Sequence, residues 1–261
     1  MDFLLYAMSG ALVGLIVGIT GIGGGSLMTP LLLLFGIPPH IAVGTDLLYA
    51  AITKASGVVA HHRQKTIRWS ITLLMVAGSI PSAIITGLVL SAFFEDYQHY
   101  TGVITTSLGV MLVVTAILLL FRKRLQLFAE KQANLSGTSW LQSNRVALTV
   151  IMGVVLGVFV TLSSVGAGAI GTVVLLILYP YLRSIQIVGT DLAHAVPLTF
   201  IGGLVHLSLG NVDYSLLGAL LLGSIPAIHL GTKIGTHLPE NLLRNALALL
   251  LMILGVKYMV F

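Results

Sequence analysis

Long apolar runs separated by short polar stretches cover almost the whole chain. Two of these runs, residues 27–36 and 170–181, reach only about half of a ~30 Å hydrocarbon core at ~1.5 Å per residue of helix. Each follows a glycine-rich break, so each is expected to be the returning arm of a re-entrant hairpin. The other runs are near the length of a full span: 3–20, 42–60, 70–93, 101–121, 146–162, 187–208, 213–235 and 242–261.

This pattern predicts an all-α polytopic membrane protein with about eight full spans and two re-entrant or broken half-helix hairpins. The composition agrees, because 57% of the residues are hydrophobic and only 8% are charged, against roughly 25% charged in soluble domains. A soluble enzyme is therefore excluded. The chain has no cysteine, its histidines match no metal-ligand spacing, and no cofactor motif is found, so we expect neither a metal nor a cofactor.

The basic residues place the loops on two sides of a lipid bilayer. The formal net charge of +5 comes from short basic clusters between apolar runs, as the positive-inside rule requires, so no nucleic-acid partner is implied. Lys257 lies on the opposite side and Lys54 lies within a run. Both termini are then expected outside. The other eleven of the thirteen bases fall on one side: Arg63, Lys65, Arg68, Arg122, Lys123, Arg124, Lys131, Arg145, Arg183, Lys233 and Arg244.

The chain also repeats itself. Residues 43–47 (Val-Gly-Thr-Asp-Leu) recur at 188–192, and residues 78–81 (Gly-Ser-Ile-Pro) recur at 223–226, both at an offset of 145. Each copy holds five apolar runs, an odd number, so the second copy must be inverted in the membrane. We expect a first transmembrane repeat over 1–121, a cytoplasmic linker over 122–145, and a second, inverted repeat over 146–261. Inverted repeats with broken helices are typical of secondary transporters.

The two glycine-rich breaks are candidate binding sites for a small anion. Irregular backbone survives at membrane depth only where it is buried in protein or lines a wet cavity, and the free N–H groups of a half-helix start attract anions. The alternative is that the glycines only allow close helix packing. The candidate substrate-binding residues are Thr20, Gly23, Gly24, Gly25 and Ser26 in the first break, and Ser163, Ser164, Gly166, Ala167 and Gly168 in the second.

Asp46 and Asp191 are the two acids within apolar runs, at equivalent positions of the two copies. Acids inside a membrane are costly and commonly functional, so a proton or Na⁺ coupling role follows as a hypothesis. Alternatively, each caps free N–H groups in a Gly-Thr-Asp turn. His194 lies one turn beyond Asp191, and Lys54 either attracts the substrate or snorkels toward the cytoplasm. The candidate coupling or gating residues are Thr45, Asp46, Lys54, Thr190, Asp191 and His194.

The chain resembles the TauE/SafE family over nearly its whole length. The resemblance rests on Gly14-xxx-Gly18-Ile-Thr-Gly-Ile-Gly-Gly-Gly-Ser26 followed by Pro30, on the Gly-Thr-Asp and Gly-Ser-Ile-Pro motifs, and on the second copy. It implies a bacterial inner-membrane permease for sulfite, sulfoacetate or related sulfur anions, commonly an exporter. The second copy departs from the family's glycine motif as Gly166-Ala167-Gly168, so an asymmetric site is expected.

The leading interpretation is a secondary transporter, not an enzyme, that binds a small sulfur-containing anion (sulfite, thiosulfate or an organosulfonate such as sulfoacetate) between the two breaks and moves it by alternating access. One alternative is an intramembrane serine hydrolase with Ser26 or Ser163 as nucleophile and His194 or His206 as base. An uncoupled anion channel is another. A homodimer through Gly-xxx-Gly faces, which Gly10, Gly14 and Gly18 exemplify, stays open because nothing in the sequence requires it.

Overall fold

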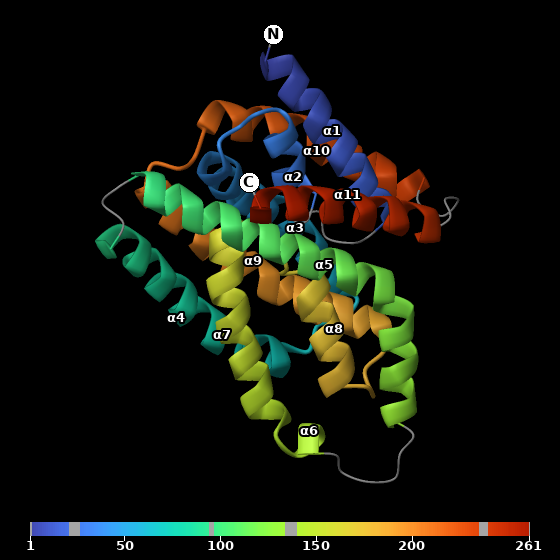
Figure 1. The fold of residues 1–261 in the computed structure, drawn as a ribbon. Coiled ribbons are helices and arrows are strands. Elements are labelled where there is room, and N and C mark those ends of the chain that lie inside the picture. Colours follow the sequence, from blue (N-terminus) through green and yellow to red (C-terminus); the bar gives the residue numbers. More distant parts are fainter. Residues whose placement is uncertain (1, 21–26, 94–96, 134–139, 235–239, 261) are drawn as a thin grey trace.

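The computed structural model describes residues 2–20, 27–93, 97–133, 140–234 and 240–260, and within these ranges every regular element is a helix. Figure 1 shows their arrangement. The helices are α1 (Asp2–Thr20), α2 (Met28–Leu34), α3 (Pro39–Arg63), α4 (Trp69–Phe93), α5 (Tyr97–Ala133), α6 (Trp140–Ser143), α7 (Arg145–Ser163), α8 (Ala169–Leu178), α9 (Ser184–Ser208), α10 (Tyr214–Ile234) and α11 (Glu240–Val260).

Each apolar run predicted from the sequence forms one of these helices. The short arms α2 and α8 have 7 and 10 residues, and each follows a glycine-rich break. Among the described residues, five helices are long and apolar enough to cross a membrane: α4, α5, α7, α9 and α10. The chain is therefore an all-helical protein of membrane-spanning character. Helix α5 has 37 residues, about 55 Å at ~1.5 Å per residue, so it continues well into the segment expected to be a linker.

Helix α3 begins earlier than the apolar pattern suggests, at Pro39, where a proline at the first helical position starts the helix without losing a hydrogen bond. Gly44, Thr45 and Asp46 are therefore inside a helix, more than a turn from its start. The interpretation of Gly-Thr-Asp as a turn in which Asp caps its own helix is wrong. The equivalent residues of the second copy are likewise inside α9, which begins at Ser184.

The helices pack in pairs drawn from the two halves of the chain. Helix α1 packs along α10, α4 along α7, α5 along α11, and α3 along α9. In Figure 1, α1 and α10 run together in the upper part of the molecule, α5 and α11 lie side by side in the middle, and α4 meets α7 at the lower left. Every one of these pairs joins an element before residue 134 to one after residue 139, so the two halves are interleaved rather than separate.

Glycines make the closest helix contacts. A Cβ on Gly153 of α7 would lie 2.3 Å from the carbonyl oxygen of Met75 on α4, and one on Gly10 of α1 would lie 2.3 Å from that of Leu220 on α10. Small residues let helix backbones approach closely. Lipid is as apolar as the helices, so helices in a membrane associate through such close packing rather than through the hydrophobic effect. These Gly-xxx-Gly faces are covered within the chain, so a homodimer cannot form through them.

Replacing one of these glycines should destabilise the protein. In Gly223→Ala the new methyl would lie 1.8 Å from the carbonyl oxygen of Ala7, whereas in Gly218→Ala, on the same helix α10, it meets nothing within 4 Å. We expect Gly223→Ala to lower the unfolding free energy by about 1–3 kcal/mol, the usual cost of overpacking. Gly218→Ala should be neutral. Thermal denaturation of both variants in detergent measures the difference, and equal melting temperatures would contradict the packing described.

Candidate functional site

Asp46 connects three elements at the centre of the molecule. It is fully buried on α3, and its Oδ2 accepts hydrogen bonds from the backbone N–H of Thr29 (3.2 Å), from the Thr29 hydroxyl and from the Ser164 hydroxyl (3.0 Å). Thr29 is the second residue of α2, so the carboxylate satisfies an N–H group that this short helix leaves free at its start. Asp46 is thus a cap, but of a neighbouring helix rather than of its own.

The second glycine-rich break is buried inside the protein. Ser163 and Ser164 are at most 1% exposed, and the Ser163 hydroxyl donates to the carbonyl oxygen of Phe159 (2.6 Å). Gly166 has φ +108°, and a Cβ there would lie 2.5 Å from Met111 Cε, so glycine is required by both conformation and space. Irregular backbone at this depth is covered by protein, which is the condition under which it is tolerated. Ala167 is also buried, and Gly168 immediately precedes α8.

Asp191 occupies the corresponding place beside the other short helix. A Cβ on Gly171, the third residue of α8, would lie 1.8 Å from Asp191 Oδ1, so the carboxylate rests directly on the glycine. The Asp191 side chain is 4% exposed, and its Oδ1, like that of Asp46, has no hydrogen-bond partner among the described residues, whereas Asp46 Oδ2 has three donors. Asp46 and Asp191 therefore share a position beside the first turn of a short helix and differ in how well their oxygens are satisfied.

Lys54 is a buried cation that interacts with both of these acids. Its side chain is only 6% exposed, so it does not snorkel to the surface. It interacts electrostatically with both Asp191 and Asp46, although no ion pair within 4.0 Å joins it to either carboxylate in the described chain. Two buried carboxylates thus face one buried ammonium. A buried charge is costly unless it is paired, so the cluster is short of one positive charge when all three groups are ionised.

His194 contacts a serine that sequence reasoning did not select. Its Nε2 lies 2.9 Å from the Ser79 hydroxyl, and both residues are fully buried. No hydrogen bond joins His194 to Asp191 in the described structure, and His194 Nδ1 has no partner there. Ser79 belongs to the repeated Gly-Ser-Ile-Pro motif, so the repetition itself was the signal that could have identified it. Thr29 could have been found from its place just after the first break.

Thr45 and Thr190 connect the two halves through equivalent hydrogen bonds. The Asp213 N–H donates to Thr45 Oγ1 (3.1 Å), and the Arg68 N–H donates to Thr190 Oγ1 (3.0 Å). Both donors are next to the start of a helix, α10 and α4, where backbone N–H groups lack partners within the helix. Each threonine therefore satisfies a helix start that belongs to the other half of the chain.

The remaining candidates lie at the edge of what the structure describes or outside it. Thr20 is the last residue of α1, and Gly23, Gly24, Gly25 and Ser26 lie outside the described residues. The hydrolase pairings with Ser163 do not form, because His194 contacts Ser79 and His206 Nε2 contacts the carbonyl oxygen of Thr161 (2.8 Å). Among the described residues, no group of three or more His, Cys, Asp or Glu could hold a metal ion.

Comparisons with known proteins agree on one class. A model of the family described as "Sulfite exporter TauE/SafE" matches residues 6–258. The chain is 39% identical over 251 residues to the Bacillus subtilis "Probable membrane transporter protein YjnA", covering 96% of this chain and 97% of the relative. It is 33% identical over 240 residues (91% and 92%) to B. subtilis YdhB and 27% identical over 276 residues (97% and 96%) to Methanocaldococcus jannaschii MJ0441, which carry the same description. No solved structure matches significantly. These names indicate membrane transporters, not enzymes.

The contact between Gly171 and Asp191 can be tested by a double-mutant cycle. In Gly171→Ala the new methyl collides with the Asp191 carboxylate, so we expect a loss of about 1–3 kcal/mol of stability. In an Asp191→Ala background the colliding oxygen is gone, and the same substitution should cost less than half as much. Thermal denaturation of the four proteins in detergent gives both values. An equal cost in the two backgrounds would show that the carboxylate does not rest on Gly171.

Proposed function

Since the chain belongs to the sulfite exporter TauE/SafE family, we propose that it is a secondary transporter of a small sulfur-containing anion such as sulfite, thiosulfate or an organosulfonate. The anion binds between the two glycine-rich breaks and moves by alternating access, coupled to H⁺ or Na⁺. The observation that carries this proposal is the buried cluster of two carboxylates and one ammonium beside the two interrupted helices.

The charge of this cluster explains why a cation accompanies the anion. With Asp46, Asp191 and Lys54 all ionised, one negative charge has no counter-charge in a region where isolated charges are costly. A proton or Na⁺ removes that charge and with it the repulsion that an arriving anion would meet. Binding of the cation and of the anion therefore favour each other, which is the linkage that a coupled carrier requires.

Asp191 is the better candidate for the cation site. Asp46 Oδ2 already accepts three hydrogen bonds, which stabilise its ionised form and hold it to α2 and the second break. Both acids have an Oδ1 without a partner among the described residues, but no hydrogen bond like those to Asp46 Oδ2 holds the Asp191 carboxylate there, which lies directly against Gly171. We therefore assign Asp46 to holding the site together and Asp191 to exchanging the coupling ion.

An inverted repeat provides for alternating access. Equivalent contacts in the two halves of the chain support the presence of such a repeat. The glycine contacts recur at offsets of 143 and 145: Gly78 approaches Val150 and Val154, and Gly223 approaches Ala7 and Ala11. The two threonine contacts are related in the same way, because 45 and 190, like 68 and 213, are 145 apart. Two halves with matching contacts can exchange conformations, which opens the site to one side and then to the other.

Uptake into proteoliposomes tests the transport proposal. We expect the purified protein to accumulate sulfite or a small organosulfonate when a pH or Na⁺ gradient is imposed. Asp191→Asn keeps the side-chain shape but loses the exchangeable charge, so gradient-driven uptake should fall about tenfold or more. Asp213→Asn is the matched control, since Asp213 is exposed and its side chain accepts a hydrogen bond from the Leu216 N–H that asparagine can also accept. Undiminished gradient-driven uptake in Asp191→Asn would eliminate the coupling assignment.

The proposed topology places both termini outside the bacterial inner (plasma) membrane and the segment before α6 in the cytoplasm. The chain has no cysteine, so one introduced residue is a unique target for a membrane-impermeant thiol reagent. In intact cells, we expect a cysteine added after Phe261 to be labelled and Gln132→Cys to be protected until the membrane is opened. Labelling of both positions from the same side would contradict the inverted arrangement.

A further inference from the structure

The proposed transport cycle gives no role to the repeated Gly-Ser-Ile-Pro motif, which stands at equivalent places in α4 and α10. Its two serines, Ser79 and Ser224, are fully buried. Ser79 lies beside His194 of α9, and Ser224 lies beside Tyr49 of α3. Since 49 and 194, like 79 and 224, are 145 apart, the two pairs are equivalent contacts of the two copies of the sequence.

One of these contacts is a hydrogen bond and the other is not. His194 Nε2 lies 2.9 Å from the Ser79 hydroxyl. The Tyr49 hydroxyl also interacts with Ser224, but no hydrogen bond of ordinary length and angle joins the two, and neither hydroxyl has another partner among the described residues. Both side chains are buried, so this conformation leaves two interior hydroxyls unsatisfied, which is costly.

The nearby threonine contacts do not differ in this way. Thr190 accepts a hydrogen bond from the Arg68 N–H, which holds the start of α4 to α9. Thr45 accepts one from the Asp213 N–H, which holds the start of α10 to α3. Both helices are therefore attached at their starts in the same manner. The inequality between the two copies lies farther along α4 and α10, at the serines.

A proline follows each serine after two residues, Pro81 inside α4 and Pro226 inside α10. A proline inside a helix removes the hydrogen bond to the carbonyl oxygen four residues earlier. In both helices the missing bond spans the serine, since that carbonyl belongs to Ala77 in α4 and to Leu222 in α10. Each helix can therefore bend at its serine more easily than elsewhere.

The glycine before each serine determines which neighbour each helix stays with. Gly78 packs against the backbone of Val150 on α7, and Gly223 packs against the backbone of Ala7 on α1, with no room for a Cβ at either place. Backbone packing thus holds α4 to α7 and α10 to α1. The serine contacts with α9 and α3 are made by side chains, so they can be broken while these backbones stay together.

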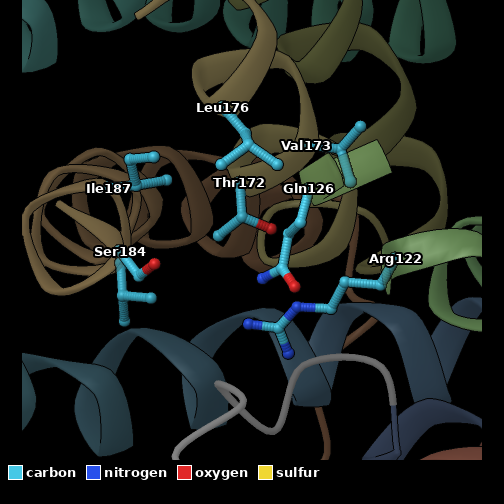
Figure 2. A pocket seen from close by; sticks show the side chains of 8 residues that line it. Arg122, Gln126, Thr172, Val173, Leu176, Ser184 and Ile187 are labelled. Carbon is cyan, nitrogen blue, oxygen red and sulfur yellow. The ribbon is translucent and has the colours of Figure 1, made fainter. Parts of the chain in front are cut away.

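Neither pair belongs to the wall of the pocket between α5, α8 and α9. Figure 2 shows that pocket, with Arg122 and Thr172 among the residues that line it, and none of the four residues of the two pairs is one of them. The pairs are contacts between packed helices. Making or breaking one of them therefore requires a movement of α4 or α10.

We propose that Ser79–His194 and Ser224–Tyr49 are alternating helix contacts, with one hydrogen bond made in each of the two conformations of the transport cycle. The inference rests on the proposed transport function and identifies these four side chains as its positioning residues. If the halves of an inverted repeat exchange conformations, the exchange makes the second bond and breaks the first. Each conformation then has one bond made and one broken, so the two can lie close in free energy and both be populated.

The two serines should have opposite effects on the ratio of the two conformations. Ser79→Ala loses the bond of the conformation described above and should shift the ratio toward the other one about fivefold or more. Ser224→Ala should shift it back by a similar factor when added to Ser79→Ala. Tyr49→Phe should act in the same direction as Ser224→Ala, and it removes only an unsatisfied hydroxyl from the described conformation, so the protein should still fold. Ser91→Ala is the matched control, because Ser91 is exposed on α4 and its hydroxyl donates to the carbonyl oxygen of Leu88.

Distances between spin labels, measured by pulsed electron paramagnetic resonance on purified protein, report this ratio. The chain has no cysteine, so labels attach only where a pair of cysteines is introduced. Ile85 of α4 with Phe200 of α9 forms one pair of exposed positions, and Leu230 of α10 with Ile52 of α3 forms the other. Ile85 and Leu230 follow the prolines, so they lie on the parts of the two helices that are expected to move.

In Ser79→Ala, the α4–α9 distance should lengthen and the α3–α10 distance should shorten. Adding Ser224→Ala should reverse both changes, and Ser91→Ala should leave both distances as in the wild type. Shifts of Ser79→Ala and Ser224→Ala in the same direction, or distances that neither variant changes, would overturn the inference. Opposite shifts in a protein that takes up no anion in proteoliposomes would support the alternating contacts and refute the transport function instead.

Discussion

Two short helices begin in the interior of this protein, and a helix that begins there must find partners for its first N–H groups other than water. Asp46 meets this need for α2, and because the same carboxylate oxygen also accepts the Ser164 hydroxyl, it ties the first short helix to the second break. The position of α3, the start of α2 and the conformation around Ser164 are therefore not independent. The Asp46 carboxylate, which binds the backbone N–H at the start of α2, is also the first charge of the central cluster.

That charge then determines what else the centre must contain. A buried carboxylate at the equivalent position, Asp191, doubles the negative charge, and Lys54 offsets only one of the two. The residue equivalent to Lys54 in the second half is Thr199, whose hydroxyl donates to the carbonyl oxygen of Ala195 (2.8 Å). The hydrogen bonds of Thr45 and Thr190 thus recur at equivalent positions of the repeated sequence, while the charge of the site does not. The difference between the two acids arises from this asymmetry and from the hydrogen bonds that Asp46 receives from Thr29 and Ser164.

The sequence was sufficient for the helices but not for the contacts between them. Apolar runs located every described helix except the four-residue α6, because burial in lipid requires apolar stretches, and the breaks were visible as glycine clusters. The environment of Asp46 was not predictable, because its partner Ser164 is 118 residues away. The alternative of a turn at Gly44-Thr45-Asp46 was wrong, and Pro39 gave the signal for an earlier helix start. Ser79 stands in the repeated Gly-Ser-Ile-Pro motif, but the repetition does not reveal that its partner is the distant His194.

The reciprocal hydrogen bonds of Thr45 and Thr190 have a consequence for biosynthesis. The first half leaves the ribosome before α9 exists, so the Arg68 N–H emerges before the hydroxyl that satisfies it. The Thr45 hydroxyl in turn has no Asp213 N–H to accept from until that residue has been synthesised. A newly inserted first half therefore lacks the partner for the start of α4 and the donor for Thr45, and it is completed only when the last third of the chain has been inserted. The order of synthesis makes the C-terminal helices the step that converts a set of inserted segments into one folded protein.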